Sequence, residues 1–581
     1  MSRVENRPIP DSTGGHSFHR MSGHELDRFL DFVTRIQTET ESCLGLPPPR
    51  EMPVMIQLLR SHFRGRLETP SSLIDAAGLP RGTGHRMLED LIARGLVQRR
   101  PRTRSGKTFS LHPSPDLIRN WFDYARRMKS LVGSAFGMPE GTEYFFGASY
   151  LTGSIIPPLP VMREQLSLRH GLRLLLHADP AFLAMQKVKQ QFEMHFGTTI
   201  EVRALSIDRL RREILDNSRR ARSSFDIVTC DLAWMAEMVD EGALHPLSDL
   251  AGAETATDLH DFHPEALATA RFGDRLFGLP VQTTPELLIH RTDLLAERGL
   301  APPTTLEETL QAARALHDPD RGVSGICWNG ARGTPVGTTF MLLMADFGQP
   351  VLNLPRTAEG FSDRDLSAAH LRPALDSDTA LMAAEFLVEL LSVSPDNVLQ
   401  MSWFERAKCY AEGRAAMAYC YTQIMPMFEN DPASPAHGRT GYQLHPSAPG
   451  VPRMAPLGGW HLCIPANLPQ GRLPDVWRAA RTLTSPAATK LYVENGSLVS
   501  SRFSVCNDPA VAHARPVIPF VDRIARAGQL KSWPRPAVPQ LHDLVRVLGE
   551  EIHTMLLRNK KPAAALRDAQ ARCDGLMHGI D

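Results

Sequence analysis

The N-terminal part of the chain carries the hydrophobic spacing of amphipathic helices. Between residues 22 and 42, apolar side chains recur at steps of three and four, which predicts a helix with one buried face. The apolar positions are Leu26, Phe29, Leu30, Val33 and Ile36. The same reasoning predicts helices over 52–64, 70–77, 82–94 and 115–131, and strands over 96–100 and 108–111. This order of elements predicts an α+β unit with a winged helix-turn-helix.

The pattern changes from residue 168 onward. Short apolar runs bounded by turn residues predict buried strands, and longer amphipathic stretches predict helices between them. The predicted strands are 172–176, 199–204 and 226–229, and the predicted helices are 181–196 and 208–217. This repeated alternation predicts a parallel sheet with helices on both of its faces.

Chain length and composition favour several domains. The 581 residues exceed what one hydrophobic core usually organises. The hydrophobic content of 43% is that of a folded protein. We expect a multi-domain protein with four parts: a disordered tail at 1–20, a winged-helix domain with flanking helices at 21–136, a Gly- and Pro-rich linker at 137–167, and a large unit at 168–581.

Charge is unevenly distributed along the chain. The 64 Lys and Arg residues balance the 64 Asp and Glu residues, which excludes a uniformly basic protein. Residues 60–107 nevertheless contain eleven basic and four acidic side chains, and such an excess favours binding to the phosphates of DNA. In a winged helix, the second helix of the motif reads the major groove and the wing reaches the backbone. The predicted DNA-binding residues are Thr83, His85, Arg86, Arg99, Arg102, Arg104 and Lys107. A winged helix that contacts protein, with these charges as a solvated face, is the alternative.

Residues 50–112 resemble the winged-helix domain of the MarR family. The resemblance rests on the run from Ser72 to Leu79, on the run from Met87 to Val97, and on the basic wing. It implies double-stranded DNA as a partner, and a homodimer held by the helices over 22–42 and 115–131. Gly84 stands where that family usually has an apolar residue, and two glycines at 82 and 84 weaken a helix start.

Residues 168–581 resemble the extracellular solute-binding proteins of ABC sugar importers (solute-binding family 1) over nearly their whole length. The matching segments follow the order of that family: 225–228 with 241–247, 277–281 with 288–295, 302–308, 412–417, 456–465, 535–536 and 560–566. The resemblance implies a two-lobed α/β domain like the type II periplasmic binding proteins, with a small-molecule carbohydrate or related solute as its ligand. His290 departs from the family, which usually has an aromatic residue there.

Capture of a sugar requires an aromatic face and polar side chains around it. Trp460 follows Gly458-Gly459, which allow a ligand to approach the backbone. Other candidates follow predicted strands, because open α/β sheets bind ligands at the carboxyl ends of their strands. The predicted ligand-binding residues are Asp179, Asp231, Trp234, Trp328, Asn329, Tyr419 and Trp460. Core packing is the alternative for any one of these tryptophans.

Motifs of catalysis and of cofactor binding are missing from the sequence. There is no P-loop, no H-E-x-x-H, no G-x-S-x-G and no G-x-G-x-x-G. The eight cysteines are scattered without a C-x-x-C pair, which predicts reduced thiols. We therefore expect no enzyme activity, no cofactor and no metal. The N-terminal residues show no export signal, and glycines and prolines interrupt the uncharged stretch 144–162, so we expect a cytoplasmic protein without membrane insertion.

These features predict a sugar- or solute-responsive bacterial transcriptional regulator. In this hypothesis the winged helix binds operator DNA and the large unit senses the ligand. One alternative is an ABC-transport receptor for a carbohydrate whose N-terminal domain contacts a protein. Another is a sugar-modifying enzyme, which would need a pair of carboxylates in its cleft.

Overall fold

The computed structural model divides into two compact units, residues Met1–Gly147 and Ala148–Asp581, and each is described by itself. The structure describes residues 23–44, 51–63, 66–76, 78–101, 109–135, 156, 165–250, 259–357, 360–364 and 366–577. The predicted tail at 1–20 and most of the predicted linker at 137–167 lie outside these ranges.

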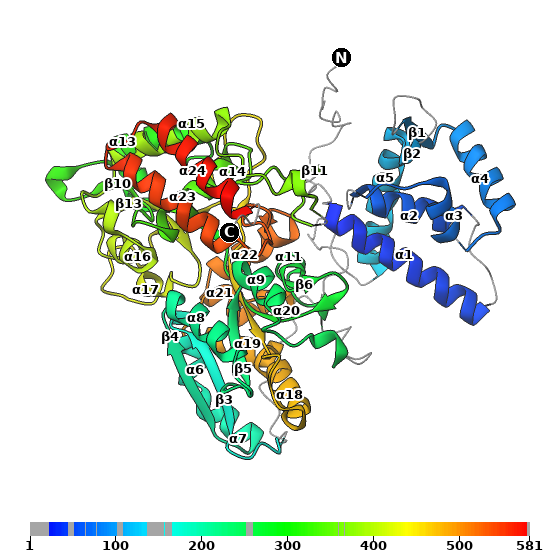
Figure 1. Ribbon diagram of the computed structural model, residues 1–581, viewed down its shortest axis with the longest axis horizontal. Coiled ribbons are helices and arrows are strands. Elements are labelled where there is room, and N and C mark those ends of the chain that lie inside the picture. The colour runs from blue at the N-terminus through cyan, green and yellow to red at the C-terminus, as the bar shows by residue number, and fades with distance from the viewer. Residues whose placement is uncertain are drawn as a thin grey trace. The chain divides into compact units, whose positions relative to one another are not determined.

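The described part of the first unit consists of five helices and a two-stranded sheet (Figure 1). Its elements are α1 (Gly23–Leu44), α2 (Met52–Phe63), α3 (Pro70–Ala76), α4 (Arg81–Ala93), β1 (Val97–Pro101), β2 (Phe109–Pro113) and α5 (Pro115–Ala135). Strands β1 and β2 pair antiparallel, with Val97 opposite Pro113. Helix α1 buries the predicted apolar face, whereas Ile36 is 45% exposed. The order of elements agrees with the predicted winged helix-turn-helix.

Helices α3 and α4 form the helix-turn-helix. Gly78 adopts a left-handed conformation (φ 63°) in the turn, and the Leu79 amide donates to the Ile74 carbonyl at 3.3 Å. Gly84 is buried where α4 crosses α3: a Cβ atom there would lie 2.6 Å from Ile74 Cγ2. The glycine that departs from the MarR pattern therefore allows the two helices to approach closely.

The first lobe of the second unit is built on a five-stranded sheet. Its strands are β3 (Leu172–His177), β4 (Ile200–Leu205), β5 (Ile227–Asp231), β8 (Leu279–Thr283) and β16 (Gly459–Cys463), in the order β4-β3-β5-β16-β8. Strands β3, β4 and β5 are parallel as predicted. Strand β16 runs antiparallel to both β5 and β8, so the prediction of a wholly parallel sheet is wrong. The reason is that β16 enters this sheet from the second lobe.

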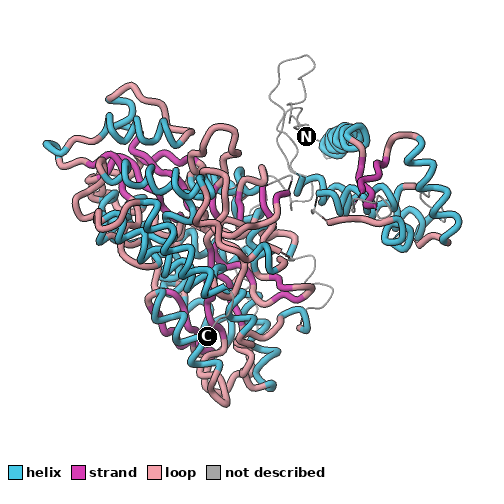
Figure 2. The backbone as a smooth tube through the Cα atoms, turned by 45° about the horizontal axis from the view of Figure 1, so that its top comes forward, coloured by secondary structure: helices cyan, strands magenta, loops and turns pink. Residues whose placement is uncertain are grey.

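Helices pack around this sheet (Figure 2). They include α6 (Pro180–Lys187), α7 (Lys189–Phe196), α8 (Ile207–Ser218), α9 (Met235–Asp240), α18 (Leu473–Leu483) and α19 (Pro486–Glu494). The single helix predicted over 181–196 is two helices, because Val188 leaves the helical region (φ −97°, ψ 8°). The buried apolar residues of the short α11 (Pro264–Thr269), α20 (Phe503–Cys506), α21 (Pro509–Ala514) and α22 (Val517–Arg526) belong instead to the hydrophobic core of the second lobe.

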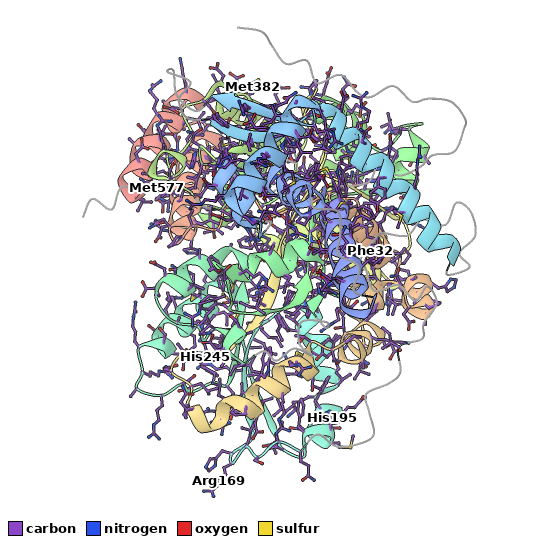
Figure 3. The ribbon with its side chains drawn as sticks, turned by 90° about the vertical axis from the view of Figure 1, so that its right-hand side faces the viewer. Phe32, Arg169, His195, His245, Met382 and Met577 are labelled. Atoms are coloured by element: carbon purple, nitrogen blue, oxygen red, sulfur yellow. The ribbon has the colours of Figure 1, made fainter. Side chains whose placement is uncertain are left out.

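The second lobe is built on a four-stranded mixed sheet. Its strands are β9 (Glu286–Arg291), β10 (Ser324–Cys327), β13 (Ala415–Tyr421) and β14 (Thr440–Gln443), in the order β10-β13-β9-β14. Its helices are α12 (Thr292–Glu297), α13 (Leu306–Leu316), α14 (Thr334–Asp346), α15 (Asp378–Leu391), α16 (Trp403–Ala411), α17 (Pro426–Glu429), α23 (Leu541–Leu556) and α24 (Pro562–Met577). Figure 3 shows Met382 and Met577 at the end of the unit formed by this lobe, and His195 and Arg169 at the opposite end.

Two hydrophobic cores underlie the two lobes. The chain passes directly from β8 to β9 through Thr284-Pro285. At this crossover the Thr284 amide donates to the Gly458 carbonyl (2.9 Å) and the Gly458 amide donates back (3.1 Å). A Cβ at Gly458 would lie 2.7 Å from the Thr284 carbonyl oxygen, so glycine is needed for this approach. The crossover places the ends of both sheets beside one another.

Candidate functional site

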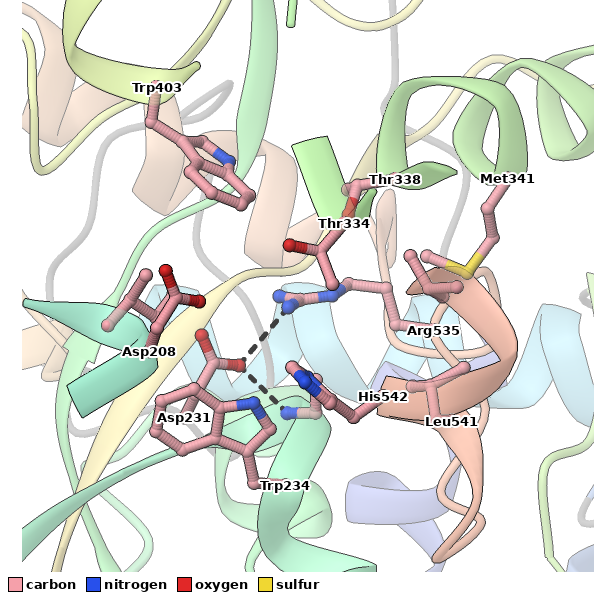
Figure 4. Close-up of a pocket in the computed structure, with 13 residues that line it drawn as sticks. Asp208, Asp231, Trp234, Thr334, Thr338, Met341, Trp403, Arg535, Leu541 and His542 are labelled. Atoms are coloured by element: carbon pink, nitrogen blue, oxygen red, sulfur yellow. Dashed lines mark hydrogen bonds and ion pairs between the residues drawn. The ribbon is translucent and has the colours of Figure 1, made fainter. Parts of the chain in front are cut away.

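A cavity lies at the boundary of the two lobes (Figure 4). The residues that line it are Ile207, Asp208, Asp231, Ala233, Trp234, Thr334, Thr338, Met341, Trp403, Arg535, Leu541, His542 and Val545. Asp231 ends β5 and Trp234 ends the short helix η1 (Leu232–Trp234), both in the first lobe. Trp403 begins α16 in the second lobe, and Figure 4 shows its indole ring across the cavity from that of Trp234.

Helices α14 and α23 form one wall of the cavity. Thr334, Thr338 and Met341 recur at helical spacing on α14, so their side chains share one face. Gly337 and Gly549 allow α14 and α23 to pack closely, because a Cβ at Gly549 would lie 1.8 Å from the Gly333 carbonyl oxygen. This close packing fixes the two hydroxyl groups at the cavity surface.

A buried ion pair crosses the cavity. Arg535 donates to Asp231 Oδ1 at 3.2 Å, and both side chains are largely buried (13% and 9% exposed). Asp231 also accepts from the Ala233 amide at 2.9 Å, which fixes its carboxylate. Burial is the largest single influence on Arg535 and lowers its pKa, but Asp231, Tyr421 and Glu286 together outweigh it, so the pKa of Arg535 is raised. The pair therefore offers a fixed acceptor and a fixed donor to a ligand.

The other titratable groups of the cavity leave it weakly negative. Burial lowers the pKa of His542, so this imidazole is neutral at pH 7. Asp231 and Arg535 neutralise each other. Asp208 is exposed at the cavity and contributes the remaining negative charge. This charge balance disfavours an anionic ligand.

Many buried polar atoms near the crossover have no hydrogen-bond partner within the described part of the chain. They include Gln282 Oε1, Thr283 Oγ1, Thr284 Oγ1, Tyr419 OH, Tyr421 OH and Thr422 Oγ1. Burial raises the pKa of Tyr421, and the Asp231 and Arg535 charges act on the same hydroxyl. Buried polar groups normally find partners, and water or hydroxyl-rich ligands supply them where protein does not. The boundary between the lobes is thus rich in groups that bind hydroxyls.

Two of the seven predicted ligand-binding residues, Asp231 and Trp234, line the cavity. Trp460 does not: it is 2% exposed and stacks on His177, with ring centroids 4.4 Å apart. Its ring also meets the edge of Trp234 at 5.7 Å, so Trp460 supports the cavity wall from the core of the first lobe. Its side chain points into the core because β16 is covered on both faces.

The remaining four predicted ligand-binding residues also lie away from the cavity lining. Trp328 is fully buried, and its Nε1 donates to Ser394 Oγ at 2.8 Å. Asp179 caps α6 by accepting from the Phe182 amide. Tyr419 packs against His445, with ring centroids 4.8 Å apart. Asn329 is 1% exposed and faces α16.

Sequence reasoning missed Trp403, Arg535 and the wall formed by α14 and α23. Ser402 and Glu405 form a capping box at the start of α16, and this S-x-x-E pattern marked Trp403 as a residue at a helix start. Such a signal locates a helix end but does not show which helix ends meet. The contribution of Arg535 comes from a loop more than 300 residues away from Asp231.

The helix-turn-helix presents a polar surface along α4. Thr83, His85 and Arg86 are exposed on this helix, and the structure brings these predicted DNA-binding residues together. Arg99 on β1 is exposed too, but it pairs with Glu89 of α4 and lies over the Phe109 ring, 5.0 Å from its centroid. Arg99 therefore fastens the hairpin to α4 as well as carrying charge. Arg102, Arg104 and Lys107 lie outside the described residues.

Within the described part of the chain, one trio of potential metal ligands comes together. His263, Cys506 and Asp522 are buried, and their ligand atoms lie within 4.8 Å of one another. Arg526 donates to both oxygens of Asp522, at 2.5 and 2.8 Å. Because this guanidinium cation opposes a second cation, the trio fits a structural ion pair better than a metal centre. The seven described cysteines are buried free thiols.

Comparison with known proteins defines the two classes of domain. A family model for the bacterial extracellular solute-binding protein matches residues 180–490, more than half of the chain. A model for the IclR helix-turn-helix domain matches residues 57–101. The protein is thus a two-lobed solute-binding unit joined to a helix-turn-helix unit. The chain belongs to the family of bacterial extracellular solute-binding proteins.

The helix-turn-helix match corrects the MarR resemblance, because the matching model is of IclR type. Winged helices share the same order of elements and the same buried positions, so hydrophobic spacing could not separate the two families. The broader prediction of a helix-turn-helix fused to a solute-binding domain is confirmed.

Solved structures confirm the fold of the second unit. A solute-binding protein of Agrobacterium radiobacter K84 in complex with ribitol matches with a TM-score of 0.64 and 24% identity, over 72% of this chain and 100% of that chain. One of Thermotoga lettingae TMO with α-D-tagatose matches with a TM-score of 0.60 and 24% identity, over 70% and 99%. One of Agrobacterium vitis S4 with D-mannitol matches with a TM-score of 0.60 and 20% identity, over 70% and 98%.

No helix among the described residues is both long and apolar enough to cross a membrane.

Proposed function

We propose that the protein is a transcriptional regulator that responds to a carbohydrate or polyol. The supporting observation is that one chain carries both a helix-turn-helix and a two-lobed solute-binding unit. In this proposal it acts in the cytoplasm as a homodimer on operator DNA, without enzyme activity and without a cofactor. Ligand binding would favour one arrangement of the two lobes, and a coupling of about 1–3 kcal/mol to DNA binding is typical of such regulators.

The ligand we propose is a neutral carbohydrate or polyol. Two indole rings, the Asp231–Arg535 pair and two threonine hydroxyls suit a molecule with apolar C–H faces and many hydroxyls. The unpaired charge of Asp208 and the neutral His542 argue against sugar phosphates and acids. Ribitol, D-mannitol and α-D-tagatose, which the similar proteins bind, are the first probes to test.

A ligand screen tests the sensing half of the proposal. Isothermal titration of the full chain with ribitol, D-mannitol and D-tagatose should show binding of at least one, and D-mannitol 1-phosphate should bind more weakly than D-mannitol. Asp231→Asn should weaken binding of the same ligand. The matched control is Asp179→Asn. This carboxylate also follows a strand of the first lobe, β3, but it caps α6 and does not line the cavity. Equal binding of the phosphate would contradict the charge argument.

A gel-shift experiment tests the DNA half. DNA from upstream of the protein's own gene should be shifted, less so as salt increases, because phosphate contacts release counterions. Arg86→Ala should weaken the complex strongly. Arg94→Ala is the control, since Arg94 is at the far end of α4 and is paired with Asp90. Absence of a salt-sensitive shift, both with and without ligand, would contradict the proposal that the protein is a transcriptional regulator.

The second candidate function is an ABC-transport receptor with an N-terminal protein-interaction domain. It is supported by the family match and by the near-complete coverage of the similar receptors. This candidate predicts recovery with the membrane fraction and no affinity for DNA. Cell fractionation together with the gel shift therefore separates the two functions.

A further inference from the structure

Asn329 lies directly behind the cavity wall, between two donors of α16. It follows β10, and its side chain is 1% exposed. With its amide oxygen turned toward α16, Asn329 accepts from Trp403 Nε1 at 3.3 Å and from Arg406 Nη1 at 3.2 Å. Both partners are obligate donors, so the group between them must be an acceptor. Trp403 is the only one of these three residues that lines the cavity.

The surrounding backbone holds this arrangement in place. The amides of Gly330 and Ala331 donate to the Met401 carbonyl, at 3.0 and 2.8 Å. A Cβ at Gly330 would lie 2.3 Å from the Val398 carbonyl oxygen, so glycine permits the close approach of the two segments. The Asn329 carbonyl accepts from Thr339 Oγ1 of α14 at 3.0 Å. Asn329 is therefore fixed to α14 and α16, two of the helices that contribute to the cavity.

Arg406 continues the chain of contacts to the crossover between the lobes. Its Nη1 donates to Glu286 Oε1 at 2.6 Å, and both side chains are almost completely buried (1% and 3% exposed). Glu286 is the first residue of β9, directly after the crossover at Thr284-Pro285. One acceptor, the Asn329 oxygen, thus joins an indole ring of the cavity to a buried ion pair at the crossover.

From this geometry we infer that Asn329 is a positioning residue that sets the orientation of the Trp403 indole for ligand binding. The part of this inference that concerns ligand binding rests on the proposed function. Asn329 does not touch the ligand; it acts through Trp403, whose ring can rotate about its side-chain bonds unless Nε1 is held. The other tryptophan of this region, Trp328, is held by Ser394 and not by Asn329, and it lies within the core of the second lobe.

Fluorine NMR of the full chain labelled with 5-fluorotryptophan tests the positioning without any ligand. The Trp403 resonance is assigned with Trp403→Phe. Asn329→Leu, which has no acceptor, should shift or broaden this resonance, whereas Asn329→Asp, which keeps one, should leave it sharp. Should the leucine variant not fold, Asn329→Ser serves instead, because its hydroxyl is too short to reach both donors. An unchanged Trp403 resonance in a folded leucine or serine variant would overturn the inference.

Ser394→Ala is the matched control for a general loss of packing. It removes the acceptor of the Trp328 indole, a hydrogen bond of 2.8 Å in the same lobe. The Trp328 resonance should move and the Trp403 resonance should stay. If Ser394→Ala moved the Trp403 resonance as much as Asn329→Leu does, the effect would be one of lobe packing and the inference would fail.

Ligand affinity provides the second readout, with ribitol, D-mannitol and D-tagatose as probes. Asn329→Leu should weaken binding about five- to tenfold, the loss expected for one hydrogen bond. In a Trp403→Phe background, the same change should have no further effect, because Asn329 would act only through the indole. Additive losses would overturn the inference. If none of the probes binds the unmodified protein, the proposed ligand is wrong, and the NMR result alone decides the role of Asn329.

Discussion

Gly84 decides how closely the two helices of the helix-turn-helix can approach. A methyl group there would lie 2.6 Å from Ile74, and β-branched isoleucine has little freedom to move away. We expect Gly84→Ala to lower the free energy of unfolding of the first unit by about 1–2 kcal/mol, although alanine favours helix. Gly82→Ala is the control, because nothing lies within 4 Å of that position and alanine should stabilise the helix. Calorimetry of the first unit's transition measures both, and equal stability would contradict the packing argument.

His290 makes the second unit sensitive to acid. Burial lowers its pKa to about 4, whereas the unfolded chain takes up the proton near pH 6.5. The unfolded state therefore binds one more proton between these values, and the native state loses stability as pH falls through this window. The loss approaches about 3 kcal/mol by pH 4.

The His290→Asn variant tests this assignment. Urea unfolding at a series of pH values should give a flatter dependence between pH 6.5 and 4 than in the unmodified protein. His513→Asn, a change at an exposed position, should leave the dependence as it is. If the His290→Asn curve keeps the full slope, another group causes the acid sensitivity.

At the scale of elements, hydrophobic spacing predicted helices and strands well where each has one buried face. Helix α4 and the strands of the hairpin begin and end within two residues of the prediction. Spacing did not predict strand direction, because the side chains of β16 alternate in the same way whether it runs parallel or antiparallel to β5. The break at Val188 was not predicted, because α6 and α7 are both amphipathic and no glycine or proline separates them.

Only some residues of the candidate site could be predicted from the sequence. Asp231 and Trp234 were predicted because they follow a strand whose carboxyl end faces the cavity. Trp460 was predicted because it follows Gly458-Gly459. The antiparallel pairing of β16 with β5 instead places Trp460 opposite Asp231 within the sheet, and its ring packs into the core. Trp403 and Arg535 come from elements whose neighbours depend on tertiary packing.

The contact between β1 and α4 has a consequence for DNA binding. Glu89 pairs with Arg99, so α4 neutralises part of the positive charge of the hairpin. Glu89→Gln should release this charge, raise DNA affinity, and steepen the dependence of log K on log salt by about one. Fluorescence anisotropy at several salt concentrations measures the slope. Adding Arg99→Ala should return the slope to its original value; if it does not, the gain comes from removing the Glu89 charge itself.

At the scale of the whole molecule, the boundary of the second unit lies within the predicted linker. Ile156 is 9% exposed, belongs to the core of the second lobe, and its amide donates to Asp508 Oδ2 at 3.2 Å. Leu166 is 7% exposed in the core of the first lobe, and its amide donates to the Phe196 carbonyl at 3.0 Å. Residues before 168 thus contact both lobes, and a ligand-dependent change in the lobes would act on the segment that leads to the DNA-binding unit.

A comparison of two fragments tests this boundary. The fragment 148–581 keeps Ile156 and Leu166, whereas 168–581 loses both, together with the hydrogen bond from the Ser167 amide to Asp475 at 2.9 Å. Two buried aliphatic side chains correspond to about 3 kcal/mol or more, so the shorter fragment should unfold at lower urea concentration. Within 148–581, Ile156→Ala should account for part of the difference, and Leu183→Ala, at a position 52% exposed, should account for little. Equal midpoints for the two fragments would place the boundary after Leu166, and the segment would then be a passive tether between the two units.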